Sequence, residues 1–315
     1  MEILDLRHFA SSDLRPLLDD EVEAWGGALC WDYRSSADMI LRYIDAKILP
    51  GYAAVERGSI IGYAFFVYEG SKGVIGDLFV SPSRSGAREI EVRLLEHVIE
   101  TLQESPGVHR VEAQLLTHST GELAAPFLSK GFQRHSRLFL SLQLAGATAP
   151  PFPALQALTD VQIRRWTEQD YQPAASVITA AYRAHIDSEI NDQYRTNAGS
   201  MRFLNNIVRF PGCGVFDSES SFVAMHRPSR SLIGLILCSR IRHDVGHVTQ
   251  VCLLPEHRGA GIGENLLASS YNALRARRLS ELSLTVTEAN RNAVELYRRI
   301  GFRERRVFDA FVWEG

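Results

Sequence analysis

The 315-residue sequence has few cysteines, little net charge and no long apolar run, and each absence excludes a class of protein. The four cysteines are widely spaced, which indicates reduced thiols rather than disulfides or a zinc site. A formal charge of -3 gives no overall attraction to nucleic acid or to an anionic membrane. The longest apolar stretches, at 60–68 and 232–238, are far shorter than the roughly 20 residues that cross a bilayer.

Several sequence signatures are also missing. The sequence contains no Gly-x-Ser-x-Gly, His-Glu-x-x-His or Cys-x-x-Cys pattern, which argues against the usual hydrolases, metalloproteases and zinc proteins. His243 and His247 lie close together, but Gly246 and the expected hairpin deny them a shared helical face, so we expect no metal. Residues 1–7 form neither a basic leader nor an apolar secretory core, which favours a cytoplasmic protein. We expect no nucleic-acid or membrane partner, and a monomer, with a dimer as the alternative.

The residues that are present have an ordinary globular composition, with 45% hydrophobic and 23% charged residues. The length corresponds to about two domains. An uncharged segment rich in Ala, Gly and Pro lies near the midpoint, at 145–153. The sequence therefore predicts an N-terminal domain over 1–145, a linker over 146–158 and a C-terminal domain over 159–315.

Both halves have the same order of predicted elements, which indicates two copies of one α+β unit. Two apolar strands precede a turn, an amphipathic helix, a third strand and a short helix that ends in Gly-Phe. The strands are predicted at 60–67, 73–80 and 111–116 and at 232–237, 246–253 and 282–286, the helices at 90–102, 124–130, 262–274 and 292–300, and a last strand at 306–313.

The most informative segment is the glycine-rich turn at 253–264, which joins an apolar strand to an amphipathic helix. Glycines leave backbone N–H groups unobstructed, and a helix start adds partial positive charge, so the turn suits a pyrophosphate. The dinucleotide pattern Gly-x-Gly-x-x-Gly fails at Glu264, and the Walker pattern fails because no Gly-Lys-Ser/Thr ending follows.

The turn resembles motif A of the GCN5-related N-acetyltransferases (GNAT), because Arg258, Gly261 and Gly263 fit its Arg/Gln-x-x-Gly-x-Gly/Ala pattern. The resemblance covers 160–314 well and the first half in outline. It implies an α+β fold, with a mixed sheet in an α/β/α arrangement, and two tandem GNAT-like acyl-CoA N-acyltransferase domains. A second family signature, Asn-x-x-Ala-x-x-Leu-Tyr-x-x-x-Gly-Phe, is met by Asn290, Ala293, Leu296, Tyr297, Gly301 and Phe302.

This resemblance implies that acetyl-CoA is the co-substrate and lies between two splayed strands. Tyr297 is then the acid that protonates the departing thiolate, and the N–H of Cys252 or Leu253 binds the thioester oxygen. A purely structural tyrosine in the core is the alternative reading of Tyr297. The implied acetyl-CoA site consists of Val251, Leu253, Arg258, Gly259, Ala260, Gly261, Ile262, Gly263, Asn290 and Tyr297.

The general base is less well defined. Gln250 stands where several family members have Glu, and an amide cannot accept a proton, so a water relay is implied. His247, Asp187 and Glu189 are candidates to complete the relay. Asp187 and Glu189 also lie in the segment 180–214, which in the family selects the acceptor. An acidic patch there would hold a protonated primary amine of a small molecule or peptide, whereas the alternative is a solvated helix face.

The first half departs from both motifs, which predicts an inactive copy. When the halves are aligned at Pro82 and Pro255, side chains with a Cβ replace the glycines of the turn, and these obstruct close approach of a phosphate. The aligned replacements are Ser85 for Arg258, Arg88 for Gly261, Ile90 for Gly263, Thr120 for Asn290 and Phe127 for Tyr297.

Two other functions compete with the N-acetyltransferase hypothesis. Gln250 at the base position is compatible with a non-catalytic acyl-CoA-binding or regulatory protein on the same scaffold. The layout in two copies also resembles tandem enzymes of the mycothiol-synthase type, although no specific substrate motif supports that substrate.

Overall fold

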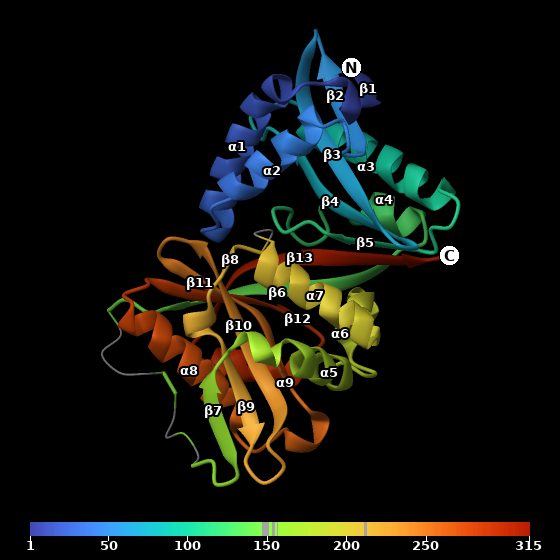
Figure 1. The fold of residues 1–315 in the computed structure, drawn as a ribbon. Coiled ribbons are helices and arrows are strands. Elements are labelled where there is room, and N and C mark those ends of the chain that lie inside the picture. Colours follow the sequence, from blue (N-terminus) through green and yellow to red (C-terminus); the bar gives the residue numbers. More distant parts are fainter. Residues whose placement is uncertain (147–150, 153–154, 156, 211–212) are drawn as a thin grey trace. The chain divides into compact units, whose positions relative to one another are not determined.

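The computed structural model describes residues 1–146, 151–152, 155, 157–210 and 213–315 (Figure 1). These residues form two compact units. Unit 1 comprises Met1–Arg137 and Arg306–Gly315, and unit 2 comprises Leu138–Arg305.

Unit 1 is built on a mixed sheet in the order β1-β2-β3-β4-β5-β13. Only the β4–β5 pair in this series is parallel. Its strands are β1 (Glu2–Asp5), β2 (Gly51–Glu56), β3 (Ser59–Glu69), β4 (Lys72–Val80), β5 (Arg110–Gln114) and the end of β13 (Arg303–Glu314), and its helices are α1 (Ser11–Leu29), α2 (Arg34–Asp45), α3 (Ala87–Glu104) and α4 (Ala124–Ser129).

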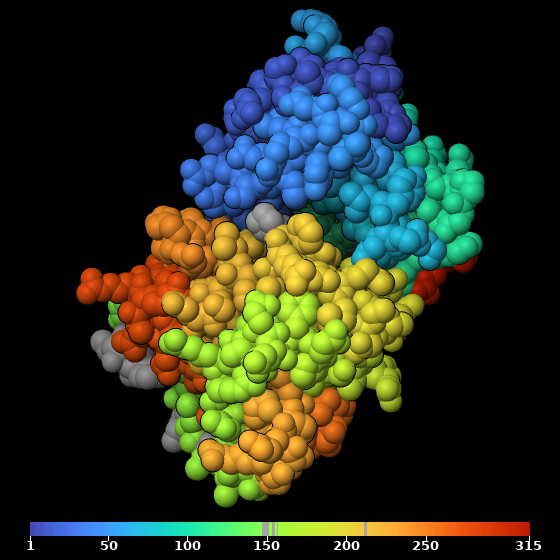
Figure 2. All heavy atoms as spheres, in the orientation of Figure 1, coloured from blue at the N-terminus to red at the C-terminus, as the bar shows by residue number. Residues whose placement is uncertain are grey.

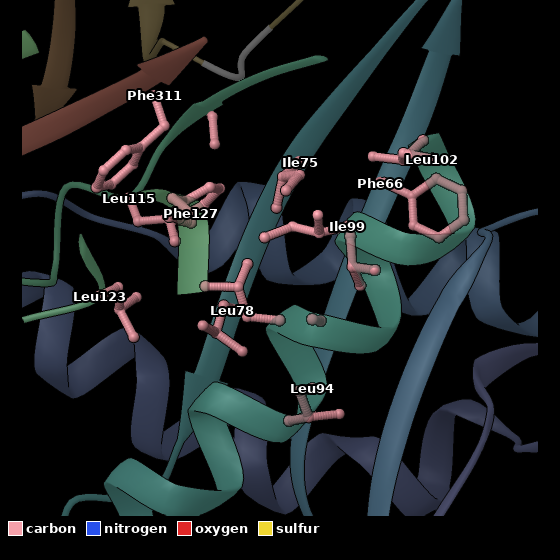
Figure 3. Close-up of a cluster of buried hydrophobic side chains, with 14 of the residues drawn as sticks. Phe66, Ile75, Leu78, Leu94, Ile99, Leu102, Leu115, Leu123, Phe127 and Phe311 are labelled. Atoms are coloured by element: carbon pink, nitrogen blue, oxygen red, sulfur yellow. The ribbon is translucent and has the colours of Figure 1, made fainter. Parts of the chain in front are cut away.

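The core of unit 1 lies between the sheet and α3. Apolar residues recur every three or four positions along α3, so one face of the helix, including Leu94, Ile99 and Leu102, is buried against the strands. Figure 3 shows these side chains together with Ile75 and Phe311 in one cluster.

Unit 2 repeats this plan. Its sheet has the order β6-β12-β11-β10-β9-β7, and β11–β12 is its parallel pair. The strands are the end of β6 (Gln133–Gln143), β7 (Val161–Arg165), β8 (Val215–Phe216, paired with β10), β9 (Phe222–His226), β10 (Ser231–Arg242), β11 (Val245–Leu253) and β12 (Glu281–Thr287), and the helices are α5 (Tyr171–Ala181), α6 (Ile186–Ile190), α7 (Asn197–Arg209), α8 (Ile262–Ala276) and α9 (Arg291–Ile300).

The predicted α+β fold class and the predicted repeat of elements are confirmed. The ends of the elements differ by a few residues: the strand predicted at 232–237 extends over Ser231–Arg242, and the one at 306–313 over Arg303–Glu314. No helix among the described residues is long and apolar enough to span a membrane.

The compact units differ from the predicted domains in their terminal strands. Residues 306–315, from the end of the sequence, belong to unit 1, and Leu138–Gln143, from the first half, belong to unit 2. The predicted boundaries follow the sequence continuously and stay a prediction. The predicted linker, 146–158, lies partly outside the described residues.

The terminal strand is therefore expected to stabilise unit 1. Phe311 on β13 is 2% exposed, and its ring stacks on that of Phe127 with centroids 3.9 Å apart. We expect Phe311→Ala to lower the free energy of unfolding of unit 1 by about 3–5 kcal/mol, because it leaves a cavity in this core. Urea unfolding followed by tryptophan fluorescence measures the effect.

The control is Glu23→Ala, which changes an exposed residue of unit 1. It is expected to alter the unfolding free energy by less than about 0.5 kcal/mol. If Phe311→Ala and Glu23→Ala have equal unfolding midpoints, the terminal strand does not stabilise unit 1.

Candidate active site

The parallel strands β11 and β12 pair over only part of their length. Val245–Val248 pair with Glu281–Leu284, but β11 continues to Leu253 and β12 to Thr287. The pairing ends next to a bulge in β11, where the register with β10 shifts. Beyond this point the facing edges of the two strands do not pair with each other, so the sheet is open there.

The backbone of β11 presents two of its N–H groups to this opening. The Leu254 N–H donates to the Ile233 carbonyl at 2.9 Å. Because hydrogen-bonded and non-hydrogen-bonded pairs alternate along antiparallel strands, the Cys252 N–H is directed towards β10. The N–H groups of Val251 and Leu253 are directed the opposite way. Of the two predicted oxyanion donors, Leu253 therefore faces the opening and Cys252 does not.

The turn after β11 forms a set of open backbone amides. Gly261 is the N-cap of α8 and has a φ of 73°, in the left-handed region that favours glycine. The first helical hydrogen bond runs from Asn265 N–H to Gly261 O, at 3.1 Å. Among the described residues no backbone carbonyl accepts from the amides of 259–264, whereas the Arg258 amide donates to Pro255. Five of the six amides predicted at 258–263 are thus available to an anion.

Arg258 has a different side-chain partner from the one predicted. Its guanidinium donates to the carbonyl of Ala181, the last residue of α5, at 2.6 Å. A guanidinium has five N–H donors, so this bond leaves others for a phosphate.

Tyr297 lies on the buried face of α9. The side chain of Asn290 caps this helix by accepting from the Ala293 amide at 3.4 Å. The ring of Tyr297 meets that of Phe302 edge to face, with centroids 5.7 Å apart. Burial, and then the nearby Asp187 carboxylate, raise the pKa of Tyr297 above its ordinary value, so the phenol keeps its proton at neutral pH. Its hydroxyl has no hydrogen-bond partner in the described part of the chain.

The segment after α5 reaches both β11 and α9. The Tyr182 hydroxyl donates to Gln250 Oε1 at 3.0 Å, and the Tyr182 ring meets His185 edge to face. His185 Nε2 lies 3.3 Å from Asn290 Nδ2. Gln250 is only 5% exposed, and its Nε2 has no partner among the described residues. Tyr182 and His185 were not predicted as site residues, because neither belongs to a sequence motif.

The two predicted acidic residues lie in different environments. Asp187 accepts a hydrogen bond from the hydroxyl of Thr287, the last residue of β12, and its side chain is 16% exposed. Glu189 is 56% exposed and pairs with Arg195 at 3.2 Å. The predicted acidic patch of Asp187 and Glu189 does not form, because residues two positions apart on a helix point to different sides. Asp187 contacts the end of β12, and Glu189 lies at the surface.

His247 lies in the paired part of β11. Its Nδ1 is 2.9 Å from the Ser283 hydroxyl on β12, and its ring stacks on Phe139 with centroids 5.6 Å apart. Gln250 lies three positions further along the strand, which corresponds to roughly 10 Å. The structure does not bring His247 to the opening.

Unit 1 shows how the first copy differs. Gly86 caps α3 with a φ of 76°, as Gly261 caps α8. Gly86 follows Pro82 by four residues, whereas Gly261 follows Pro255 by six. The ungapped alignment that placed Arg88 at Gly261 is therefore wrong, because the loop of unit 1 is two residues shorter. Arg88 stands at the place of Gly263, the second residue of the helix.

The backbone of this shorter loop is paired at three of the six amides that correspond to 259–264. The amides of Ala87 and Glu89 donate to Arg84 O and Gly86 O, at 3.3 and 3.1 Å. Arg88, at the place of Gly263, pairs with Glu91 at 2.9 Å. Both copies have a carboxylate at the next position, but Glu89 lies 2.8 Å from where a Cβ on Gly86 would stand, whereas Glu264 pairs with Arg299. The loop of unit 1 thus has a salt-bridged side chain where unit 2 has a glycine.

The register of the strands also shows which residues correspond across the repeat. Val80 pairs with Gly62 as Leu253 pairs with Gly234, so Asp77 occupies the place of Gln250. Asp77 is buried and accepts from the Tyr33 hydroxyl, as Gln250 accepts from Tyr182.

In unit 1 a second carboxyl, Glu21 of α1, meets Asp77 in the core. Glu21 is fully buried and accepts from the hydroxyl of Tyr63 at 2.6 Å and from the indole of Trp25 at 3.3 Å. Burial, followed by repulsion from Asp77, raises the pKa of Glu21 well above its ordinary value. The pair therefore keeps a proton in the folded state and has a structural role.

The open parallel pair, the turn of free amides and the buried tyrosine on the following helix all lie in unit 2. Residues 184–302 match the family model "Acetyltransferase (GNAT) family". The match lies within unit 2, so unit 2 is a domain of the GNAT type.

Solved structures share the fold along the whole chain. A GCN5-related N-acetyltransferase from Sphaerobacter thermophilus is 17% identical, with a TM-score of 0.65 over 99% of this chain and 95% of that one. A tandem GNAT protein from the clavulanic acid biosynthesis pathway is 15% identical, with a TM-score of 0.63 over 99% and 98%. At these identities the likeness shows the tandem fold.

Curated relatives match over shorter segments. A mycothiol acetyltransferase from Thermobifida fusca is 36% identical over 28% of this chain and 29% of its own length. An N-alpha-acetyltransferase from Sulfurisphaera tokodaii is 34% identical over 22% and 42%. These alignments span less than half of either relative. A mycothiol acetyltransferase from Frankia casuarinae is 25% identical over 82% of this chain and 72% of its length.

The buried carboxyl pair in unit 1 predicts a pH-dependent stability. The pKa of Glu21 is higher in the folded state than in the unfolded state, where it is near 4.3. The protonated pair therefore stabilises the fold fully below the unfolded pKa, and this stabilisation is lost as the pH rises towards the folded pKa. One retained proton changes the unfolding free energy by about 1.4 kcal/mol per pH unit in that range. We expect Glu21→Gln to flatten this dependence between pH 5 and 7, as measured by urea unfolding at several pH values.

Glu23→Gln is the control, since Glu23 is exposed on the same helix. It is expected to retain the slope of the native protein. An unchanged slope in Glu21→Gln would show that the pair holds no proton.

Proposed function

We propose that the protein is an acetyl-CoA-dependent N-acetyltransferase that works from unit 2 and transfers the acetyl group to a primary amine by direct attack in a ternary complex. The observation that carries this proposal is that unit 2 has both features: a strand edge and turn with backbone amides that lack backbone partners, and a Tyr297 hydroxyl without a partner among the described residues. The printed names of the relatives, mycothiol acetyltransferase and N-alpha-acetyltransferase, support an acetyl-transfer reaction.

The residues fit the carrier that the family implies. Val251 and Leu253 offer backbone N–H groups, which β12 does not pair, for the carbonyls of pantetheine, and the turn at 259–263 offers N–H groups for a pyrophosphate. A Cβ added to Gly259 would meet no atom within 4 Å, so this part of the turn is open. Acetyl-CoA supplies the acetyl thioester, and the protein supplies binding, orientation and proton transfer.

Two groups would act on the thioester. The Leu253 N–H would donate to the carbonyl oxygen as negative charge develops there. The Tyr297 hydroxyl would protonate the departing thiolate. A phenol near pKa 10 is a weaker acid than a thiol near 8.5, but burial that raises the pKa of Tyr297 also disfavours an anionic sulfur beside it.

The surface segment α5–α7 would form the acceptor side of the site. Its yellow-green and yellow atoms lie in the middle of the face of unit 2 that is turned to the viewer in Figure 2, beside orange and red atoms of other elements. Asp187 lies on this segment and is oriented towards Thr287, where it can attract a cationic amine.

A non-catalytic acyl-CoA-binding protein is the second candidate. Gln250 favours this candidate, because a neutral side chain stands at the strand position where a base is expected. The hydroxyl of Tyr182 donates to Gln250 and holds it there. Acetyl-CoA binding without transfer to any amine would support this candidate.

The first test of the proposed function is the number of acetyl-CoA sites. Calorimetry should find one site per chain, because only unit 2 has the open turn. Gly261→Val should abolish binding, since Val is strained at a φ of 73° and a side chain there obstructs the turn. Arg88→Ala in unit 1 should leave the affinity within about twofold. Two equivalent sites per chain would contradict the assignment to unit 2.

The second test concerns the acid. Tyr297→Phe should lower the rate of acetyl transfer on the order of 10²- to 10⁴-fold, the range for loss of a positioned acid, with little change in acetyl-CoA affinity. Tyr171→Phe, which removes a hydroxyl bonded to Asn205 on α7, is the matched control. Native turnover in Tyr297→Phe, with chemistry rate-limiting, would make Tyr297 a packing residue.

A further inference from the structure

We propose that the carboxylate of Asp187 is the proton acceptor for the attacking amine, in the role that Gln250 cannot fill on the strand. This inference rests on the proposed function. It assigns the base to α6, a helix outside the sheet, and it predicts a cationic primary amine as the acceptor.

The position of Asp187 carries the argument. Thr287 ends β12 at the opening, is 1% exposed, and donates its hydroxyl to Asp187 Oδ1. The other oxygen, Oδ2, lies 3.6 Å from His185 Nδ1. Burial is the main cause of the raised pKa of Tyr182 and of Tyr297, and the charge of Asp187 adds to the rise in each. The carboxylate therefore lies close to the proposed acid and to the tyrosine that binds Gln250.

Unit 1 provides an internal comparison for the strand position. Asp77 and Gln250 occupy the same register position, and each accepts from a tyrosine hydroxyl. A carboxylate is thus compatible with this position of the fold, but in unit 1 it is paired with Glu21 in the core. In unit 2 the strand residue is neutral, and the carboxylate comes from α6.

His185 is less suited to be the base. Its Nδ1 accepts the backbone N–H of Asp187 at 3.2 Å, and its Nε2 contacts the side chain of Asn290. Both ring nitrogens are engaged in holding the start of α6 against α9, so His185 is a positioning residue for Asp187.

The proton balance is as follows. The bound ammonium loses one proton to solvent, and the neutral amine nitrogen attacks the thioester carbon and becomes cationic. The Asp187 carboxylate takes the proton that this nitrogen releases as the new N–C bond forms. The C–S bond then breaks, and the sulfur takes the hydroxyl proton of Tyr297. Asp187 returns its proton to the Tyr297 phenolate through solvent, which restores the starting state.

The experiment measures thiol release from acetyl-CoA with putrescine, tyramine, glucosamine and a tetrapeptide with a free N-terminus as acceptors. For the best acceptor, Asp187→Asn should lower kcat/KM by about 10²- to 10³-fold, the range for loss of a general base. The acetyl-CoA affinity should change less than twofold. Glu189→Gln, on the same helix but paired with Arg195 at the surface, should stay within twofold of the native rate.

A rescue variant separates a proton acceptor from a structural residue. Gln250→Glu in the Asp187→Asn background returns a carboxylate to the site from the strand, and it should restore the rate at least tenfold. The pH–rate profile of the double variant should again show a fall in rate at low pH, which the Asp187→Asn variant alone lacks. Thr287→Val, which removes the hydroxyl that orients Asp187 but keeps the carboxylate, should lower kcat/KM about tenfold, and it tests the same claim if Asp187→Asn fails to fold.

The failures are distinguishable. If the native protein binds acetyl-CoA but acetylates none of the amines, the proposed function fails. If the native protein transfers acetyl and Asp187→Asn keeps the native rate and pH profile, the assignment of Asp187 is overturned and the proposed function stands. If Asp187→Asn does not fold, Thr287→Val decides in the same way. Loss of activity in Asp187→Asn without rescue by Gln250→Glu and without a change in pH profile would also overturn it, and would make Asp187 structural.

Discussion

The site depends on one constraint: the parallel pairing of β11 with β12 ends at Val248 and Leu284, although both strands continue. Backbone N–H and C=O groups beyond that point must find partners elsewhere, because unpaired buried polar groups are costly. The bulge at Thr249, whose hydroxyl donates to the Leu237 carbonyl at 3.1 Å, turns the following residues out of register. The opening is therefore built into the strand pairing, and an extended chain of amides such as pantetheine fits it.

The same constraint operates in unit 1 with a different outcome. There β4 pairs with β5 over Lys72–Ile75, and Gly76–Val80 continue without that partner. The sheet opens in both copies, but the shorter loop of unit 1 is partly paired internally, and the strand carboxylate Asp77 is buried with Glu21. The two copies of the fold thus differ: unit 2 has an open turn, whereas in unit 1 the strand carboxylate Asp77 lies with Glu21 in the core.

Much of this arrangement could be predicted from the sequence, because periodicity and local motifs determine it. The glycine turn, the capping Asn290 and Tyr297 lie within two short segments whose spacing is a local property. Features that depend on tertiary contacts could not be predicted in this way. The two-residue difference between the loops misplaced Arg88, and the different tertiary partners of Asp187 and Glu189, Thr287 and Arg195, separated the two carboxylates. The exchange of terminal strands between the units involves residues far apart in the sequence, and no local pattern indicates it.

The central claim is that the unpaired edge of β11 and the turn after it bind acetyl-CoA. Hydrogen exchange of backbone amides, with and without saturating acetyl-CoA, tests this claim most directly. The account predicts slower exchange for the amides of Val251, Leu253 and 259–263, with no change at 76–88 in unit 1. Protection at 76–88 that equals or exceeds protection at 251–263, or no protection in either region despite measured binding, would contradict it.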